Sequence, residues 1–486
     1  MSGAETVPRF AVIGHPNKGK SSIVATLAED DSIRVSPVPG TTQQARRFGF
    51  SIDGRALYQL VDTPGFQRAR ELLNWLEQHD SAASERSALV AEFVQQHRDD
   101  PRFHDECELL KPLLEGAGIL YVVDGAKPYG AEYELEMEVL RWTGRPRMAL
   151  INLIGEGDYV DEWRAALGQY FSIVRVFDAV HADFDKRLDL LRGFAELDEH
   201  WKPQLNEAVS VLLAERARRV QRSAEEIAAM LSELLVAQAT KPIAMEAEED
   251  AVARDALQQT LTEHLKRQIR QRERTCRRAV AQIYRHFQVN EDPDAEGDGT
   301  PSTSGALLAS ELFAQESWRL FGLSRQQLLV TGALSGAVAG SGVDLLLGGA
   351  SLLLGAGIGA AIGGASAWIG GDELAKVKVL GQRLGGKVMQ VGPVREPNFP
   401  WVLLGRAWLH HKLISERNHA RREALAMDAS LASHHMDGLP RDIKRPLARL
   451  FAKLRADADS VVHQAELTAL VSSILAAEVQ LDATVQ

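Results

Sequence analysis

The sequence predicts an α/β fold with a mostly parallel sheet, followed by a mainly α-helical C-terminal region that contains a glycine-rich helical hairpin. Short apolar runs alternate with helical patterns over residues 8–200, which is typical of a parallel sheet wrapped by helices. A glycine-containing turn joins the first apolar run to the first helical pattern. Beyond residue 204, apolar residues recur every three or four positions, as amphipathic helices require.

The apolar runs give the expected strands of the first domain. We expect five strands at residues 10–13, 56–61, 119–123, 148–151 and 173–177. Residues 46–52 add an edge strand. A chain of 486 residues is longer than one hydrophobic core usually serves, so we expect two or three domains.

Composition restricts the class of protein and its compartment. The net charge of −11 argues against a protein that coats nucleic acid over its whole surface, although a local basic patch stays open. Only Cys107 and Cys276 are present, which predicts a reducing compartment and neither a disulfide framework nor a zinc site. The first ten residues lack a secretory pattern, so we expect the cytoplasm or the cytosolic face of the inner membrane.

The strongest motif is G-H-P-N-K-G-K-S, which begins at Gly14 and is here called the P-loop. Its backbone N–H groups and the following helix start can bind phosphate oxygens. Lys20 can reach the β- and γ-phosphates, and the Ser21 hydroxyl can ligate Mg²⁺. The motif therefore predicts a nucleoside triphosphate hydrolase. The expected phosphate contacts come from Gly14, Asn17, Lys18, Gly19, Lys20, Ser21 and Ser22.

Two further motifs complete the expected phosphate site. D-T-P-G, residues 62–65, ends the second parallel strand, so Asp62 can hold Mg²⁺ through a water and the Gly65 N–H can reach the γ-phosphate. P-G-T-T, residues 39–42, can close on Mg²⁺ through Thr42 and release it after hydrolysis. An ordinary turn is the alternative for each motif. We predict catalytic roles for Lys20, Thr42 and Gly65, and a magnesium site at Ser21, Thr42 and Asp62.

Together, the three motifs resemble those of the TrmE–Era group of translation-factor-related GTPases over roughly the first 200 residues. The resemblance implies GTP as substrate, Mg²⁺ as cofactor and a monovalent cation, K⁺, beside Asn17. It also implies that Thr42 contacts Mg²⁺. The residue after D-T-P-G is apolar in this group and is Phe66 here, so no glutamine orients water from that position. Intrinsic turnover should therefore be slow, with a cation or another residue assisting.

The base-recognition motif departs from the family pattern N-K-x-D. Asn152 fits its first position, but the aspartate expected three residues later is missing. Asp158 could replace it only if the loop is rebuilt. The next base-contacting loop begins at Asp178 and Ala179, so we expect base contacts from Asn152, Asp178 and Ala179. Guanine preference is therefore less firmly predicted than phosphate binding.

The remaining expectations concern domain organisation. The first domain carries a long helical insertion that could sense nucleotide state. Residues 240–250 read as a turn, and residues 387–404 as a short hairpin. Residues 398–404 resemble part of a bacterial domain of unknown function that follows Era-like G domains. The predicted parts are a GTPase domain at 1–203 with an insertion at 67–113, a charged helical region at 204–289, a linker at 290–305, and a glycine-rich hairpin with a helical domain at 306–486.

Glycines spaced by four, as at Gly332, Gly336 and Gly340, predict closely packed helices in the apolar segment 326–371. Asp344 divides this segment into two halves near the length of a membrane span. Segment 326–371 could therefore insert into or dock on a membrane, or form a tightly packed soluble hairpin, and the sequence leaves both alternatives open. The basic helix at residues 266–285 could meet anionic lipid or RNA phosphate, or form a solvated face paired with acidic neighbours.

Three functions fit the sequence. The first is a GTP-hydrolysing switch that can associate with a membrane through its C-terminal half. The second is an RNA- or ribosome-binding assembly GTPase, which we rank lower because the sequence offers neither a KH-type G-x-x-G loop in a basic context nor interleaved aromatic residues. The third is a nucleotide-binding scaffold with little turnover. A homo-oligomer is a further expectation.

Overall fold

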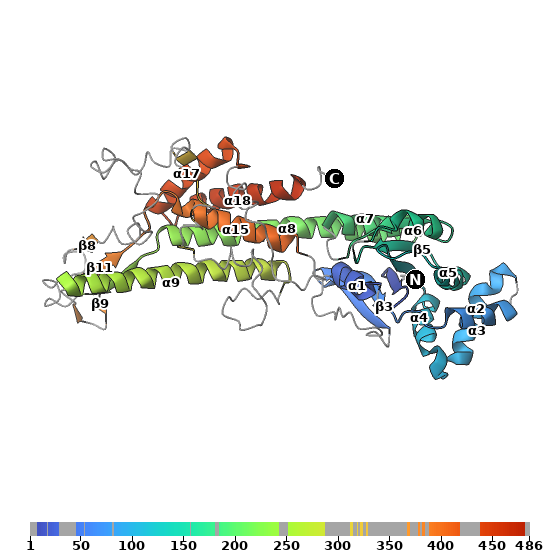
Figure 1. Cartoon of the computed structure of the whole chain (residues 1–486). Coiled ribbons are helices and arrows are strands. Elements are labelled where there is room, and N and C mark those ends of the chain that lie inside the picture. Colours follow the sequence, from blue (N-terminus) through green and yellow to red (C-terminus); the bar gives the residue numbers. More distant parts are fainter. Residues whose placement is uncertain are drawn as a thin grey trace, which may run out of the picture. The chain divides into compact units, whose positions relative to one another are not determined.

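The structure is a computed structural model of the whole chain (Figure 1). It describes residues 7–16, 18–28, 45–52, 54–79, 82–155, 157–179, 184–242, 251–286, 388–417 and 438–481, with short pieces between residues 312 and 383. The chain forms two compact units. The first comprises Met1–Arg216 with Glu416–Arg422, and the second comprises Ala217–Ser415 with Glu423–Gln486.

The first unit contains a six-stranded sheet in the order β2-β3-β1-β4-β5-β6. β2 is antiparallel to β3 at one edge, and all other neighbouring strands are parallel. This confirms the mostly parallel sheet and the predicted edge strand. The carboxyl ends of the parallel strands share one edge, where α/β sheets bind ligands. The strands are β1 Arg9–Ile13, β2 Arg46–Ile52, β3 Arg55–Asp62, β4 Gly118–Asp124, β5 Arg147–Asn152 and β6 Ile173–Val176.

Helices cover both faces of this sheet, because successive strand residues point to opposite sides. Phe10 and Val12 belong to one core, and Ala11 and Ile13 to the other. The first core also contains residues of α1 Lys20–Ala28, α7 Phe184–Leu197 and the beginning of α8 Lys202–Leu235. The second contains residues of α2 Ala69–Gln78, α3 Arg86–His97, α4 His104–Leu114, α5 Glu132–Trp142 and α6 Val160–Leu167.

The connection between β3 and β4, where the sequence predicts an insertion at residues 67–113, contains three helices. It consists of α2, the short 3-10 turn Ala83–Glu85, α3, the turn Pro101–Phe103 and α4. α4 packs on α3 and β1, while α2 packs on α3 and α5. α4 therefore carries the chain from the helical insertion back to the sheet.

The second unit is mainly helical, which confirms the predicted class of the C-terminal region. Its largest helices are the later part of α8, α9 Ala251–Ile283, α15 Phe399–Ser415, α17 Arg441–Ala456 and α18 Val461–Leu481. Small strands accompany them: β7 Ala239–Pro242, β8 Ala367–Ile369, β9 Lys378–Val379, β10 Gln382–Arg383 and β11 Val388–Val391. β11 lies between β7 and β8 in an antiparallel sheet.

Two local expectations for this unit are wrong. Residues 240–242 belong to β7 rather than to a turn, because they pair with β11 about 150 residues later in the chain. Residues 387–404 do not form a hairpin: Val388–Val391 pairs with two distant strands, and α15 begins at Phe399. Pro400 suits the first turn of a helix, where its missing N–H needs no partner.

A buried ion pair lies inside the second unit. Arg406 Nε of α15 donates to Glu273 Oε1 of α9 at 2.6 Å. The two side chains are 2% and 4% exposed, so the pair is shielded from water. Tyr284 follows the end of α9, and its Oη lies 2.9 Å from Nε2 of His411 in α15.

The glycine-rich segment 326–371, with Gly332, Gly336, Gly340 and Asp344, lies outside the described residues apart from residues 327–328 and 367–369. Within the described part of the chain, every helix is too short or too polar to cross a membrane. The predicted hairpin and its two alternatives, membrane docking and soluble packing, remain predictions.

Candidate functional site

The P-loop closes β1 and leads into α1 at Lys20. At two positions of the P-loop only glycine fits, because of a close approach at one and the backbone conformation at the other. A Cβ on Gly14 would lie 2.2 Å from the Val122 carbonyl oxygen. Gly19 has φ of +79°, a left-handed conformation that other residues rarely adopt. The turn is therefore tightly curled against neighbouring strands.

Lys20 points back into this turn. Its Nζ donates to the carbonyl oxygens of Gly14 at 3.0 Å and His15 at 3.1 Å. Burial lowers the pKa of Lys20, while the carboxylates of Asp62 and Glu136 partly oppose this shift. Two neutral carbonyls are weaker partners for an ammonium than phosphate oxygens, so an incoming phosphate can replace them.

Ser21 and Asp62 meet beside Lys20. The Ser21 Oγ donates to Asp62 Oδ2 at 3.1 Å, and Asp62 is 4% exposed at the end of β3. Hydroxyl and carboxylate oxygens are the ligands that Mg²⁺ prefers, so this pair fits the predicted ion. Thr63 Oγ1 donates to the Val12 carbonyl at 2.8 Å and fixes the D-T-P-G segment beside β1.

Gly65 lies directly on the P-loop. A Cβ at this position would be 2.8 Å from both Pro16 Cδ and Pro16 N, and 2.9 Å from the Gly14 carbonyl oxygen. Phe66, the next residue, is 2% exposed and belongs to the core under the insertion helices. The backbone of residues 62–66, here called the second switch segment, thus contacts the P-loop.

Several predicted contacts cannot be placed. Asn17 and residues 39–42, including Thr42, lie outside the described residues. The K⁺ site at Asn17, the Thr42 contact with Mg²⁺ and the closing first switch segment therefore stay predictions. Ser22 lies in the first turn of α1 with 9% of its surface exposed.

On the base side, Asn152 links two loops. Its Nδ2 donates to the Lys18 carbonyl at 3.1 Å, and its Oδ1 accepts from the Ala179 N–H at 3.0 Å. Thr26 Oγ1 donates to the Ala179 carbonyl at 2.8 Å. Lys18, Asn152 and Ala179 are therefore brought together, and Asp178 lies next to them, half-buried.

Asp158 is exposed, and its Oδ1 accepts a long hydrogen bond of 3.4 Å from the Val160 N–H at the start of α6. Gly157 packs so closely on Ala126 that a Cβ would lie 2.2 Å from the Ala126 carbonyl oxygen. The loop after β5 is thus folded toward the β4–α5 connection, and the contacts described for Asp158 do not include Asn152.

Sequence reasoning missed a buried ion pair at the same edge. Lys18 Nζ lies 3.8 Å from Asp124 Oδ2, and the two residues are 4% and 2% exposed. Asp124 also accepts from the Ala126 N–H at 3.1 Å. The sequence contained a signal for Asp124. It directly follows an apolar run, and the same pattern identified Asp62 as a site residue.

A second missed acid is Glu136 of α5, which is 3% exposed. It accepts from the Tyr121 hydroxyl at 2.7 Å, and its other oxygen lies 2.9 Å from His15 Nδ1 in the P-loop. Burial raises the pKa of Tyr121, and Glu136 adds to the shift. Glu136 thus supports the outer side of the phosphate loop from the neighbouring helix.

The comparisons with known proteins agree with this geometry. Residues 9–152 match the family described as 50S ribosome-binding GTPase, and residues 164–475 match a domain of unknown function, DUF3482. GTPase Der of Rhodopirellula baltica is 36% identical over 90 residues, covering 18% of this chain and 20% of the relative. GTPase Der of a Thermoanaerobacter species is 35% identical over 124 residues, covering 25% and 28%. The matches thus span only 20% and 28% of the length of these relatives.

Two solved structures are also similar to parts of this chain. An Era variant of Aquifex aeolicus bound to GDP and AlF4⁻ is 19% identical, with a TM-score of 0.27, over 49% of this chain and 72% of that one. The NFeoB domain of S. thermophilus bound to GDP, AlF4⁻ and K⁺ is 17% identical, with a TM-score of 0.27, over 58% and 100%. These values are too low to carry an argument about function. The family matches carry the assignment: the chain belongs to the DUF3482 family, and its N-terminal domain is a P-loop GTPase domain related to GTPase Der.

Proposed function

We propose that this protein is a molecular switch that binds Mg²⁺–GTP, hydrolyses it slowly, and passes the nucleotide state to its helical regions. One observation carries the proposal. Lys20, Ser21 and Asp62 converge where β1 and β3 end, with the Lys20 ammonium inside the turn and the Ser21 hydroxyl 3.1 Å from the Asp62 carboxylate. This arrangement matches the chemical needs of a magnesium-bound triphosphate.

Catalysis at such a site works by positioning and by stabilising charge. The Lys20 ammonium and the N–H groups of the P-loop would hold the β- and γ-phosphates in line. Ser21 and Asp62 would hold Mg²⁺, which neutralises phosphate charge when bound. The Gly65 N–H would face the γ-phosphate. Phe66 carries no group that could orient water, which supports slow intrinsic turnover and assistance by K⁺ beside Asn17.

Nucleotide titration with GTP and ATP, in Mg²⁺ and either K⁺ or Na⁺, tests this proposal. We expect at least tenfold tighter binding of GTP, about 1.4 kcal/mol, and faster phosphate release in K⁺. Lys20→Ala should abolish triphosphate binding, whereas Lys202→Ala, which removes an exposed lysine of α8, should not. Equal affinities for the wild type and Lys20→Ala would refute the site. Binding without phosphate release in either salt would identify a nucleotide-binding scaffold instead.

A second candidate concerns the partner of the second unit. Much of the charge of α9 is internally paired: Lys266 contacts Glu263 at 2.7 Å, and Arg272 contacts Glu226 at 2.9 Å and also Glu233. This supports the solvated-face alternative for part of the helix. Arg267, Arg274 and Arg278 remain exposed, at spacings of seven and four that keep them on one side.

We propose that this arginine stripe, residues 267, 274 and 278, binds RNA phosphate, because the matched GTPase family is described as ribosome-binding. Crosslinking to RNA should weaken with rising salt and with Arg274→Glu. Flotation with anionic vesicles is the competing test, and binding to vesicles but not RNA would favour the membrane partner. Sedimentation of the free protein tests the expected homo-oligomer.

A further inference from the structure

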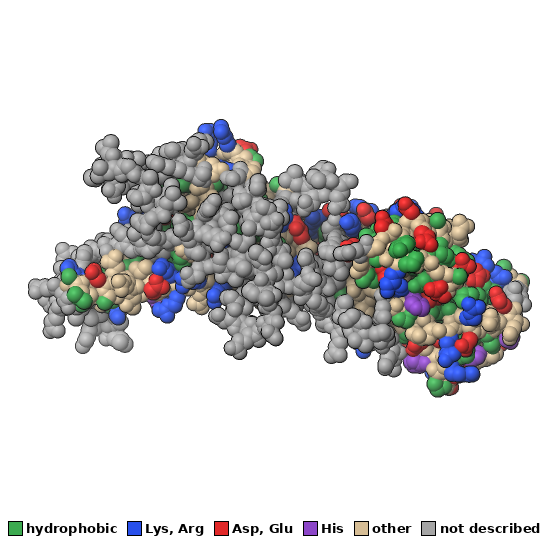
Figure 2. All heavy atoms as spheres, viewed as in Figure 1, with side chains coloured by type: hydrophobic (Ala, Val, Ile, Leu, Met, Phe, Trp, Pro, Cys, Tyr) green, Lys and Arg blue, Asp and Glu red, His purple; other side chains and the backbone are tan. Residues whose placement is uncertain are grey.

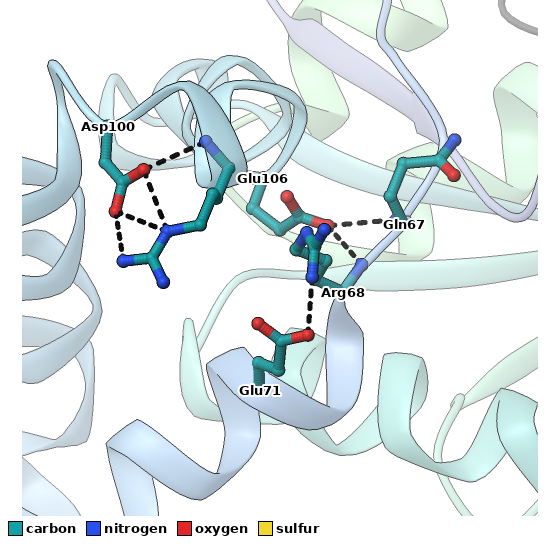
Figure 3. Close-up of polar contacts among 6 residues, drawn as sticks. Gln67, Arg68, Glu71, Asp100 and Glu106 are labelled. Carbon is teal, nitrogen blue, oxygen red and sulfur yellow. Dashed lines mark hydrogen bonds and ion pairs between the residues drawn. The ribbon is translucent and has the colours of Figure 1, made fainter.

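Two glutamates of α4 accept hydrogen bonds from backbone N–H groups, one after the second switch segment and one before β2. Glu106 Oε1 accepts from the Gln67 N–H at 2.9 Å and from the Arg68 N–H at 2.6 Å (Figure 3). These two residues directly follow the second switch segment and precede α2. The insertion thus holds the end of the second switch segment through one carboxylate oxygen.

Glu106 is an unusual residue to find in this place. It is 0% exposed, and burying a carboxylate is costly unless hydrogen bonds compensate. Two charge-assisted bonds and the positive end of α2 provide that compensation. Arg68 is the N-cap of α2 and has no side-chain cap of its own, so Glu106 satisfies this backbone donor from another helix.

The second oxygen of Glu106 is buried, and the described residues offer it no hydrogen-bond partner. A buried polar atom in this state marks an arrangement that costs free energy. Packing alone would favour an apolar side chain here, as at the neighbouring Cys107 and Leu110, which face the same core. The role of the Glu106 carboxylate is therefore to hold the Gln67 and Arg68 amides, here called the Glu106 tether, and not to fill the hydrophobic core.

Glu108 makes the matching contact on the other side. Residues two positions apart on a helix point in different directions. Glu108 Oε2 accepts from the Ala45 N–H at 3.3 Å, and Ala45 immediately precedes β2. α4 therefore contacts the backbone in two places, after the second switch segment and before β2.

We infer that α4 holds the second switch segment in place, with Glu106 as a positioning residue for GTP hydrolysis and Glu108 as a second contact of the same helix, to Ala45. This inference rests on the proposed switch function. The Glu106 tether sets where Gly65 and Phe66 lie relative to the P-loop, on which Gly65 packs. It does not touch Lys20 or Ser21. Loss of the tether would free this backbone without pushing any atom against the P-loop, so it should lower kcat and leave the affinity for GTP largely unchanged.

The test uses the full chain. Glu106→Ala should lower kcat at least tenfold, with KM for GTP within about threefold of the wild type, because small displacements of positioned groups reduce rates strongly. Glu106→Gln keeps an oxygen that can accept from both amides and should restore most of kcat. Glu71→Ala is the matched control: it also removes a carboxylate from Arg68, but an exposed one that contacts only the side chain, at 2.6 Å (Figure 3).

Hydrogen exchange gives a second readout that does not depend on activity. The Gln67 and Arg68 amides should exchange slowly in the wild type and quickly in Glu106→Ala. Glu108→Ala removes a half-buried side chain, so it should fold normally, and it should lower kcat non-additively with Glu106→Ala. Wild-type kcat and amide exchange in Glu106→Ala would overturn the inference, as would an equal loss in Glu71→Ala. A wild-type protein that fails to bind GTP would instead overturn the proposed function.

Discussion

A single added methyl group at Gly65 tests whether the second switch segment and the P-loop must touch. Gly65→Ala would place a Cβ 2.8 Å from Pro16 N and Pro16 Cδ and 2.9 Å from the Gly14 carbonyl. Ordinary contacts begin near 3.4 Å, so the two segments must separate by about 0.6 Å. The contacting atoms belong to backbone and to a proline ring, which cannot rotate away. Overpacking of this kind costs roughly 1–3 kcal/mol.

That cost should appear at the nucleotide site. If the GTP-bound protein cannot accommodate this separation of the two segments, its affinity for GTP falls. The cost of roughly 1–3 kcal/mol corresponds to a loss of roughly 5- to 150-fold. Fluorescent GTP titration measures the affinity, and calorimetric unfolding measures any part of the cost borne by the free protein. Gly49→Ala makes the same chemical change in β2, where no atom lies within 4 Å of the new Cβ, and should be neutral. Wild-type affinity and thermal stability in Gly65→Ala would refute the reasoning.

The remaining predictions concern buried charge and buried thiols. Glu273→Gln should lower the free energy of unfolding of the second unit by about 3–5 kcal/mol in urea titrations, because it breaks the buried pair with Arg406. Burial raises the pKa of Cys107 to about 11 and that of Cys276 to about 12. Since the thiolate is the reactive form, neither should react with a thiol reagent at pH 8 until urea unfolds the chain; rapid labelling of the folded protein would contradict the described burial.

The phosphate site could be predicted from sequence because its parts are local or tied to strand ends. The P-loop is one contiguous run whose curl follows from its own glycines. Asp62 was recognisable because it ends a buried strand, and the ends of parallel strands share one edge. The same rule would have selected Asp124. The sequence could not show that Asp124 forms an ion pair with Lys18, since Lys18 lies about a hundred residues away and is itself part of the P-loop motif.

Glu106 shows a different limit. In the sequence it stands among Phe103, Cys107 and Leu110 at spacings of three and four, so the helical pattern predicts that it is buried. The pattern cannot identify what it bonds, because its partners are backbone amides, which every residue carries. The small sheet of the second unit was missed for a related reason: β7 and β11 are short, and they pair only across a long stretch of chain.

The distribution of charge bears on which form of the nucleotide the site accepts. On the face of the first unit seen in Figure 2, acidic and basic side chains are interspersed, so this face offers no broad field that would attract an anion. The buried groups give selection a local basis. Lys20 favours phosphate, but Asp62 lies on the same side, 4% exposed and 3.1 Å from Ser21. A triphosphate without its metal would bring negative charge against that carboxylate in a poorly hydrated space. We therefore expect the site to prefer the magnesium complex strongly over free nucleotide.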